Sequence, residues 1–205
     1  MSLDENSFSI FLDTIKKFVD NKLIPREEEV AETNSIPEDI VEEMKNIGLF
    51  GISIPTEYGG SNLSMEQEVK LTFELGRASP AFRSMAGTNI GIGSQTIVMS
   101  GTDEQKQKYL PKLSSGEWFG CYCLTEPGAG SDANSGKTKA ILSEDGSHYK
   151  ITGQKMWISN AGFASLMIVF ARIEDDKNIT GFLVPYDAEN GIRLGDEENK
   201  LGIHS

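Results

Sequence analysis

The hydrophobic spacing of this 205-residue chain changes from helical to alternating near Gly116. Before that point apolar residues recur every three or four positions, which is typical of amphipathic helices. After it, apolar and polar residues alternate, which is typical of strands. The sequence therefore predicts an α+β protein, with an all-α helical domain over residues 1–117 and a small β domain over residues 118–205.

Local signals place the expected helices. The first apolar run begins at Phe8 and should end at Pro25, because proline cannot continue a helix. Three segments, 35–38, 64–67 and 102–105, carry a hydroxyl residue followed three positions later by Glu or Gln. That spacing is the capping box, in which each side chain bonds the backbone of the other residue. We expect a helix after each box.

Residues 81–100 differ from these helices because they carry few charges and many small side chains, including Gly87, Gly91 and Gly93. Glycine at this density weakens a helix, so close packing against another surface would have to compensate. The segment is either a buried core helix or the lining of a ligand channel, and both can hold.

Six segments after Gly116 alternate and are separated by turn residues. Strands this closely spaced predict a small antiparallel sandwich or barrel. The chain stops at LGIHS without a further helix, so we expect this β domain to be incomplete and the chain to be a fragment. The six expected strands are 118–125, 137–142, 148–152, 155–159, 166–173 and 179–185.

Composition excludes several classes of function. The chain has 31 acidic and 19 basic residues, a net charge of −12, which argues against nucleic-acid binding. It has no apolar run near the roughly 20 residues of a membrane span, and its polar N-terminus is unlike a signal peptide. Two histidines and two cysteines are too few for a known metal-ligand spacing. Cys121 and Cys123 are two apart in an expected strand, so they should be packed thiols.

The loop GAGSDA, residues 128–133, is similar to a dinucleotide-binding fingerprint, but an alternating strand follows it instead of the required helix. A glycine-rich loop can still hold phosphate through backbone N–H groups, with Ser131 as a hydroxyl donor. The alternative is a tight connection in which Asp132 caps the turn. Trp157 and Ser159 likewise have two interpretations, as core and turn residues or as one wall of a flat cofactor site.

Four stretches together resemble the acyl-CoA dehydrogenase family. They are CLTEPGAGSDANS at 123–135, GQKMWISNAG at 153–162, the helix-to-strand junction at 101–127, and IPTEYGG at 54–60. The resemblance implies an N-terminal helical domain, a middle β domain and a C-terminal four-helix domain, of which the last is absent from these residues. It also implies an FAD-dependent enzyme of fatty-acid β-oxidation that oxidises acyl-CoA to trans-2-enoyl-CoA. Electrons would pass to electron-transferring flavoprotein, and the enzyme would be a cytoplasmic homotetramer.

The resemblance also implies roles for individual residues. Gly130 and Ser131 would lie near the FAD phosphates and the CoA, so Ser131 would also bind substrate. The catalytic base would be a glutamate of the absent domain, and the family gives Glu126 no such role. An oxidase or flavin monooxygenase of the same family, or a non-catalytic CoA- or partner-binding module, are the alternatives. The full set of expected FAD contacts is Tyr122, Leu124, Thr125, Gly130, Ser131, Trp157, Ile158 and Ser159.

Overall fold

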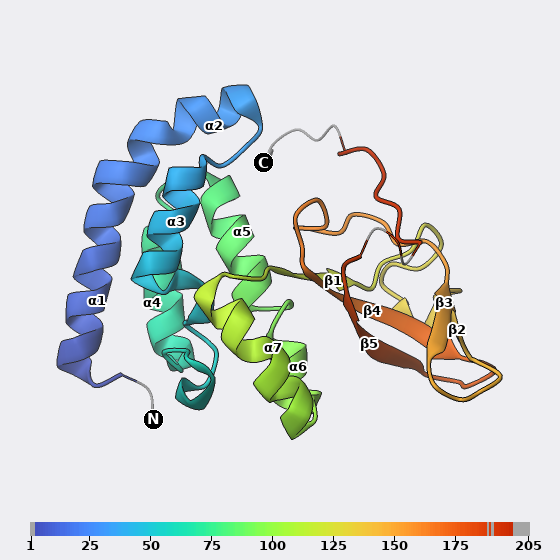
Figure 1. Ribbon diagram of the computed structural model, residues 1–205. Helices are drawn as coiled ribbons and strands as arrows, with labels where there is room; N and C mark the ends of the chain where they lie inside the picture. Colours follow the sequence, from blue (N-terminus) through green and yellow to red (C-terminus); the bar gives the residue numbers. More distant parts are fainter. Residues whose placement is uncertain (1–2, 188, 190, 199–205) are drawn as a thin grey trace. The chain divides into compact units, whose positions relative to one another are not determined.

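The computed structural model describes residues 3–187, 189 and 191–198. The chain divides into two compact units, one ending at Trp118 and one spanning Phe119–Glu198. The first unit is helical and the second is built on one sheet, so the predicted order of a helical domain followed by a β domain is confirmed (Figure 1).

The helical unit contains seven α-helices within the described residues. They are connected by short turns, several of them 3₁₀-helical. The α-helices are α1 (Glu5–Phe18), α2 (Glu27–Thr33), α3 (Glu38–Ile47), α4 (Met65–Leu75), α5 (Pro80–Ile90), α6 (Gln95–Ser100) and α7 (Asp103–Ser115).

Pro25 does not end the first helical run, contrary to the sequence prediction. The chain passes from α1 through a π-helical turn, Val19–Leu23, and a 3₁₀ turn, Ile24–Arg26, into α2. Pro25 lies in the first turn of the 3₁₀ segment. A proline is tolerated there, because the N–H that it lacks has no partner within the helix at that position.

Two of the three predicted capping boxes are present. Ser64 caps α4 and Thr102 caps α7, each with both reciprocal bonds formed. The box predicted at Ser35 is wrong, because the residue before α3 is Pro37 and no side chain caps that helix. With proline as the residue before it, the helix starts at Glu38, three residues beyond Ser35, so the hydroxyl is out of reach of the first turn.

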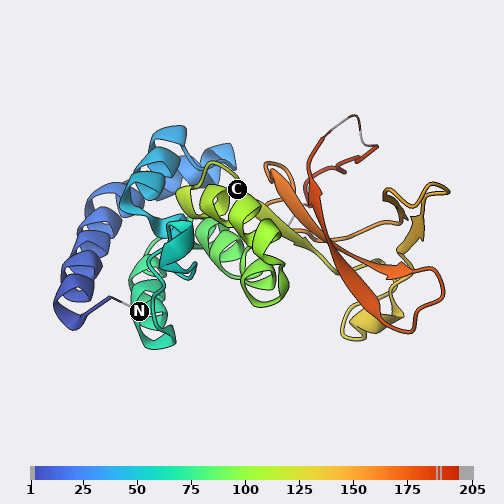
Figure 2. The same ribbon diagram turned by 60° about the horizontal axis from the view of Figure 1, so that its bottom comes forward.

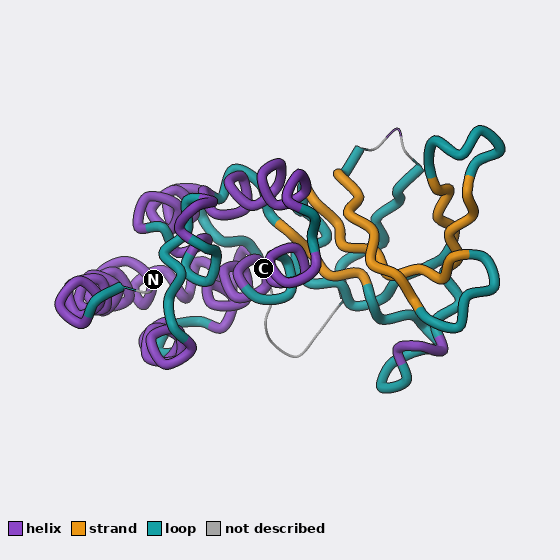
Figure 3. Tube along the Cα trace, turned by 90° about the horizontal axis from the view of Figure 1, so that it is seen from below, coloured by secondary structure: helices purple, strands orange, loops and turns teal. Residues whose placement is uncertain are grey.

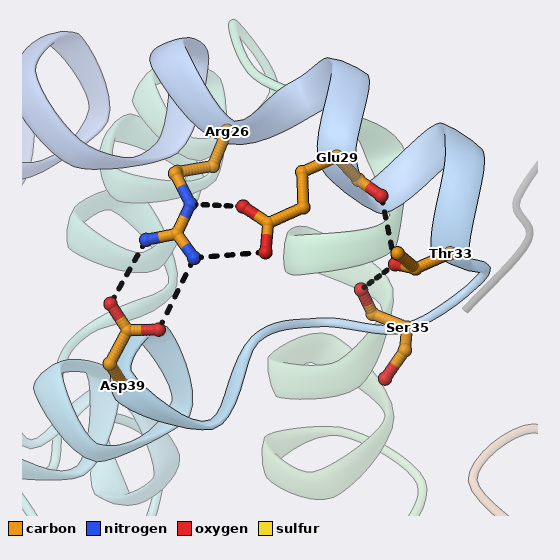
Figure 4. Close-up of polar contacts among 5 residues, drawn as sticks. All are labelled: Arg26, Glu29, Thr33, Ser35 and Asp39. Carbon is orange, nitrogen blue, oxygen red and sulfur yellow. Dashed lines mark hydrogen bonds and ion pairs between the residues drawn. The ribbon is translucent and has the colours of Figure 1, made fainter.

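In place of a capping box, the guanidinium of Arg26 connects α2 to α3 (Figure 4). Arg26 pairs with Glu29 on α2 and donates to Asp39 on α3, with an Nη1 to Oδ2 distance of 3.0 Å. The hydroxyl of Thr33 donates to the carbonyl of Ser35 at 3.2 Å. These contacts hold the turn between the two helices without an N-cap.

Residues 81–100 form two helices, not one. The break lies between α5 and α6, where a Cβ added to Gly93 would come within 2.8 Å of the Thr88 carbonyl oxygen. Phe82 and Asn89 are fully buried, and the Asn89 amide donates to the Leu113 carbonyl at 3.0 Å. The core interpretation is confirmed for these residues, and the channel stays a prediction.

The second unit is a five-stranded sheet centred on β4 (Leu166–Ile173). On one side β5 (Ile179–Pro185) pairs antiparallel with residues 166–172 of β4. These are the long orange and red strands of Figure 2. On the other side β1 (Gly120–Cys123) pairs with the first half of β4 and β2 (Lys139–Leu142) with its last residues. The strand β3 (Tyr149–Thr152) continues the sheet from β2.

This sheet is mixed, which corrects the antiparallel pairing expected from the sequence. Both β1 and β2 run parallel to β4, whereas β2–β3 and β4–β5 are antiparallel hairpins. Parallel pairs need long crossovers. The crossover from β1 to β4 spans residues 124–165 and combines loops, teal in Figure 3, with β2 and β3. The strand expected over residues 155–159 is also absent: these residues form a loop. Trp157 has a φ of 58° there, which an extended strand does not permit.

The two thiols lie in the core of the sheet unit, as predicted. Cys121 and Cys123 are buried on the same face of β1, with their Sγ atoms 3.6 Å apart. Met167 packs with them, and Ile158 covers the cluster from the loop before β4. The hydrogen bond with Cys123 and burial raise the pKa of the Cys121 thiol, so this thiol stays protonated at neutral pH.

Candidate functional site

The two sequence motifs meet in the sheet unit. The first continues from the end of β1 into the turn at Glu126–Ala129, and the second occupies the loop between β3 and β4. The backbone N–H of Met156 donates to the carbonyl oxygen of Thr125 at 2.9 Å. This bond joins Thr125 directly to the loop that carries Trp157, at the residue before the tryptophan.

The carboxylate of Glu126 is the most connected polar group of this region. Its Oε1 accepts from the Lys155 ammonium at 2.8 Å and from the Thr138 N–H at 3.0 Å. Its Oε2 accepts from the Lys137 N–H at 2.6 Å. The side chains of Glu126 and Lys155 are only 7% and 13% exposed, so this is a largely buried ion pair.

Burial acts to raise the pKa of Glu126, but the hydrogen bonds from Lys155, Thr138 and Lys137 outweigh it. The net effect lowers the pKa to about 2. Glu126 is therefore ionised at neutral pH and its oxygens are already occupied by donors. A carboxylate in this state is a poor proton acceptor, which fits the expectation that it is not a catalytic base.

Trp157 presents a large aromatic surface to solvent. Its side chain is 69% exposed, and its backbone lies in the left-handed region with φ 58°. That conformation costs free energy for a bulky residue, and such outliers concentrate at functional sites. Ser159 is also exposed, and Asn160 follows with φ 66°. The loop thus holds an exposed ring and a hydroxyl close together in sequence, on an irregular backbone.

The other predicted contacts lie in different environments. Tyr122 is half-buried with its ring 4.7 Å from that of Phe170, so its phenol ring already has a protein partner. The side chain of Ile158 packs on the thiol cluster, and its carbonyl accepts from the Ala161 N–H at 3.2 Å. Gly130 and Ser131 are exposed beyond the Glu126–Ala129 turn.

The groups of the two motifs suit a flat ligand with polar edges and a phosphate. Trp157 supplies an exposed aromatic face, and Thr125, Ser131 and Ser159 supply hydroxyls. A Cβ at Gly130 would meet no atom within 4 Å, so the backbone there is open to close approach. A single 3₁₀ turn follows this loop, which confirms that it does not open a dinucleotide-binding helix.

The part of the chain that the structure describes has neither a metal-ligand cluster nor a membrane-spanning helix. No group of three or more His, Cys, Asp or Glu side chains there could hold a metal ion. Among the same residues, none of the helices combines the length and apolar character that crossing a bilayer requires.

Sequence reasoning missed the connecting role of Lys155, which it placed in a strand. The ammonium donates to the Leu124 carbonyl at 3.0 Å as well as to Glu126. It also missed Gly136 and Gly153, whose missing side chains leave space for Glu126 and Thr138. A lysine and a glutamate within two matched motifs were the available signal, but their pairing depends on long-range contacts that spacing does not reveal.

Comparison with known protein families gives two adjoining matches. Residues 7–117 match the acyl-CoA dehydrogenase N-terminal domain, and residues 121–205 match the acyl-CoA dehydrogenase middle domain. Together these two matches account for nearly all of the chain.

Individual proteins give the same result. A probable acyl-CoA dehydrogenase of Bacillus subtilis is 38% identical over 192 residues, covering 93% of this chain and 32% of that protein. Acryloyl-CoA reductase (NADH) of Anaerotignum propionicum is 36% identical, covering 92% of this chain and 48% of that one. An acyl-CoA dehydrogenase of Bacillus anthracis, solved in complex with FAD, superposes with a TM-score of 0.86 at 36% identity, over 98% of this chain and 35% of its own. The chain thus spans about a third to a half of these relatives.

Proposed function

Because the chain belongs to the acyl-CoA dehydrogenase family, we propose that the natural protein binds FAD and oxidises an acyl-CoA to the trans-2-enoyl-CoA. The observation that carries this proposal is the junction of the two motifs. The Met156–Thr125 bond joins a loop with an exposed tryptophan to a loop with exposed glycine and hydroxyl groups. A relative of known structure, at 36% identity, was solved with FAD.

The residues of this chain would bind and orient the cofactor. Trp157 would cover one face of the ring system and exclude water from it. The hydroxyls of Thr125 and Ser159, with backbone groups of Tyr122, Leu124 and Ile158, would hydrogen-bond its polar edge. When bound, FAD supplies the two-electron acceptor for the oxidation. Donors aimed at the ring edge favour the reduced state, because negative charge develops there.

Ser131 and the open backbone at Gly130 would hold the phosphates and contact the CoA moiety. The base that removes the α-proton would be a glutamate outside these 205 residues. We also propose that the enzyme passes its electrons to electron-transferring flavoprotein and acts in fatty-acid β-oxidation. It would be a tetramer in the cytoplasm. These properties are carried over from the family resemblance.

Cofactor binding is the first test. The natural gene product, stripped of flavin and titrated with FAD, should quench flavin fluorescence with a stoichiometry of one FAD per chain. FMN and riboflavin are matched probes, because they share the ring but lack the adenine half. Absence of FAD binding would contradict the proposal and favour the non-catalytic binding module.

One relative makes a second direction of reaction worth testing. Its name, acryloyl-CoA reductase (NADH), denotes reduction of the unsaturated thioester. The FAD-loaded protein should be assayed with acyl-CoA and an artificial electron acceptor, and with enoyl-CoA and NADH. Turnover only in the second assay would reverse the assigned direction. Hydrogen peroxide formed with acyl-CoA and oxygen alone would identify an oxidase.

A further inference from the structure

We propose that Glu126 and Lys155 are a positioning pair for the FAD site, fixing the first motif loop against the second. This inference rests on the proposed function. Neither side chain is expected to contact the flavin. They act through their neighbours, Thr125 on one loop and Trp157 on the other.

The first step of the argument is that Lys155 bonds the first loop twice. Its ammonium donates to the Leu124 carbonyl at 3.0 Å and to the Glu126 carboxylate at 2.8 Å. These acceptors lie on either side of Thr125, whose own carbonyl accepts the Met156 N–H at 2.9 Å. Three consecutive residues of one loop are thus held by two consecutive residues of the other.

A third segment completes the connection. The N–H groups of Lys137 and Thr138 donate to the two oxygens of the same carboxylate, at 2.6 and 3.0 Å. The chain approaches so closely that a Cβ on Gly136 would lie 2.9 Å from Glu126 Oε1. Glu126 therefore joins the first motif, the two residues just before β2 and the second motif.

The third segment also packs directly on the second motif. A Cβ on residue 153 would lie 2.7 Å from the Thr138 Cβ, so only glycine fits at this position. The three segments therefore touch one another pairwise, and the Glu126 carboxylate accepts bonds from two of them. Moving any one of them would break hydrogen bonds to the others.

Net stabilisation of the fold does not explain why this pair is buried, although removing one partner would leave the other charge unpaired and destabilise the unit. Burying two charges costs desolvation free energy that their attraction only partly offsets, so a buried ion pair is weak evidence for stabilisation. Its hydrogen bonds are directional, however, and fix the groups that they join. Since Lys155 precedes Trp157 by two residues, a small change at this pair would change where the exposed ring lies.

The experiment compares four single variants of the natural gene product: E126Q, K155M, K155R and a control, F182A. The control removes the ring that packs edge-on against Tyr149, with centroids 5.4 Å apart, and should lower the stability of the same unit. Phe182 lies in β5 and Tyr149 in β3, so both residues are outside the two loops. The readouts are the dissociation constant for FAD, the visible circular dichroism of the bound flavin, and the melting temperature. The dichroism reports the protein groups around the flavin ring. It should not change in a variant that only lowers the stability of the fold.

E126Q and K155M should weaken FAD binding at least tenfold and alter the flavin dichroism. K155R, which keeps the charge and donors, should stay within about threefold of wild type. F182A should lower the melting temperature with unchanged dichroism and FAD affinity. If E126Q and K155M lower only the melting temperature, the positioning role is overturned while FAD binding by wild type still supports the proposed function. If wild type itself binds no FAD, the proposed function fails first, and this inference fails with it.

Discussion

The backbone N–H of Met156 lies 2.9 Å from the carbonyl oxygen of Thr125, although the two residues are 31 positions apart in the chain. The bond crosses between two loops, and the buried Lys155–Glu126 pair lies immediately beside it. Two motifs that are separate in sequence thereby become one surface, with Trp157 exposed beside it.

The ion pair predicts how acid affects stability. The pKa of Glu126 is lowered to about 2, so its contribution is fully present above the unfolded value near 4.3 and is lost as pH falls toward 2. Urea unfolding of the 205-residue chain at a series of pH values should show wild type more stable than E126Q by up to roughly 3 kcal/mol at pH 7. The difference should shrink between about pH 5 and pH 2. A difference that does not change with pH would contradict this assignment.

A side chain should be tolerated far less well at Gly136 than at Gly128. Gly136→Ala would bring a methyl group 2.9 Å from the Glu126 carboxylate, whereas a Cβ at Gly128 meets nothing within 4 Å. Overpacking of this kind costs about 1–3 kcal/mol, and the chemical-denaturation midpoint measures it. Gly128→Ala is the matched control and should unfold like wild type. Equal effects at the two positions would show that the carboxylate does not lie where we describe it.

The helix caps give a prediction within the helical unit. Ser64→Ala and Thr102→Ala should each destabilise the chain by about 1 kcal/mol, because each removes a side-chain acceptor from the first turn of its helix. Ser35→Ala should have almost no effect, since the exposed Ser35 hydroxyl caps no helix. Thermal unfolding monitored by circular dichroism distinguishes them. If Ser35→Ala lowered stability as much as the other two substitutions, Ser35 would have to cap α3, contrary to the structure.

Trp157 should show opposite effects on stability and on function. Trp157→Asn places a residue that tolerates φ 58° where a bulky one is strained, and it removes a ring that is 69% exposed. We expect stability equal to or greater than wild type and a loss of FAD affinity of tenfold or more. Trp157→Phe keeps an aromatic face and should retain most of the affinity. Tight FAD binding by the Asn variant would remove this residue from the site.

Much of the fold follows from local sequence signals. Period and turn residues located β4 and β5 at the residues that the structure shows, because both strands are continuous and end at clear turns. Ser64 and Thr102 act as caps because nothing nearby competes with them. Ser35 failed because the proline two positions later is itself the residue before the helix.

Long-range geometry accounts for the remainder. The parallel pairing of β1 and β2 with β4 depends on crossovers whose direction alternation cannot reveal. The alternating pattern predicts that Lys155 is a strand residue. In the structure, however, the ammonium of Lys155 is largely buried, and Trp157, two residues later, has a left-handed backbone conformation. The site residues came from motif resemblance, and the contacts that join their loops became visible only in three dimensions.

The proposed dehydrogenase reaction is tested most directly by anaerobic titration of the FAD-loaded natural gene product with acyl-CoAs of increasing chain length, following flavin absorbance. We predict bleaching of the oxidised flavin band without oxygen or added reductant, with one chain length giving the tightest response. The corresponding enoyl-CoA should form in step with the bleaching. A flavin band unchanged by every acyl-CoA, in a protein that has bound its FAD, would contradict the proposed reaction.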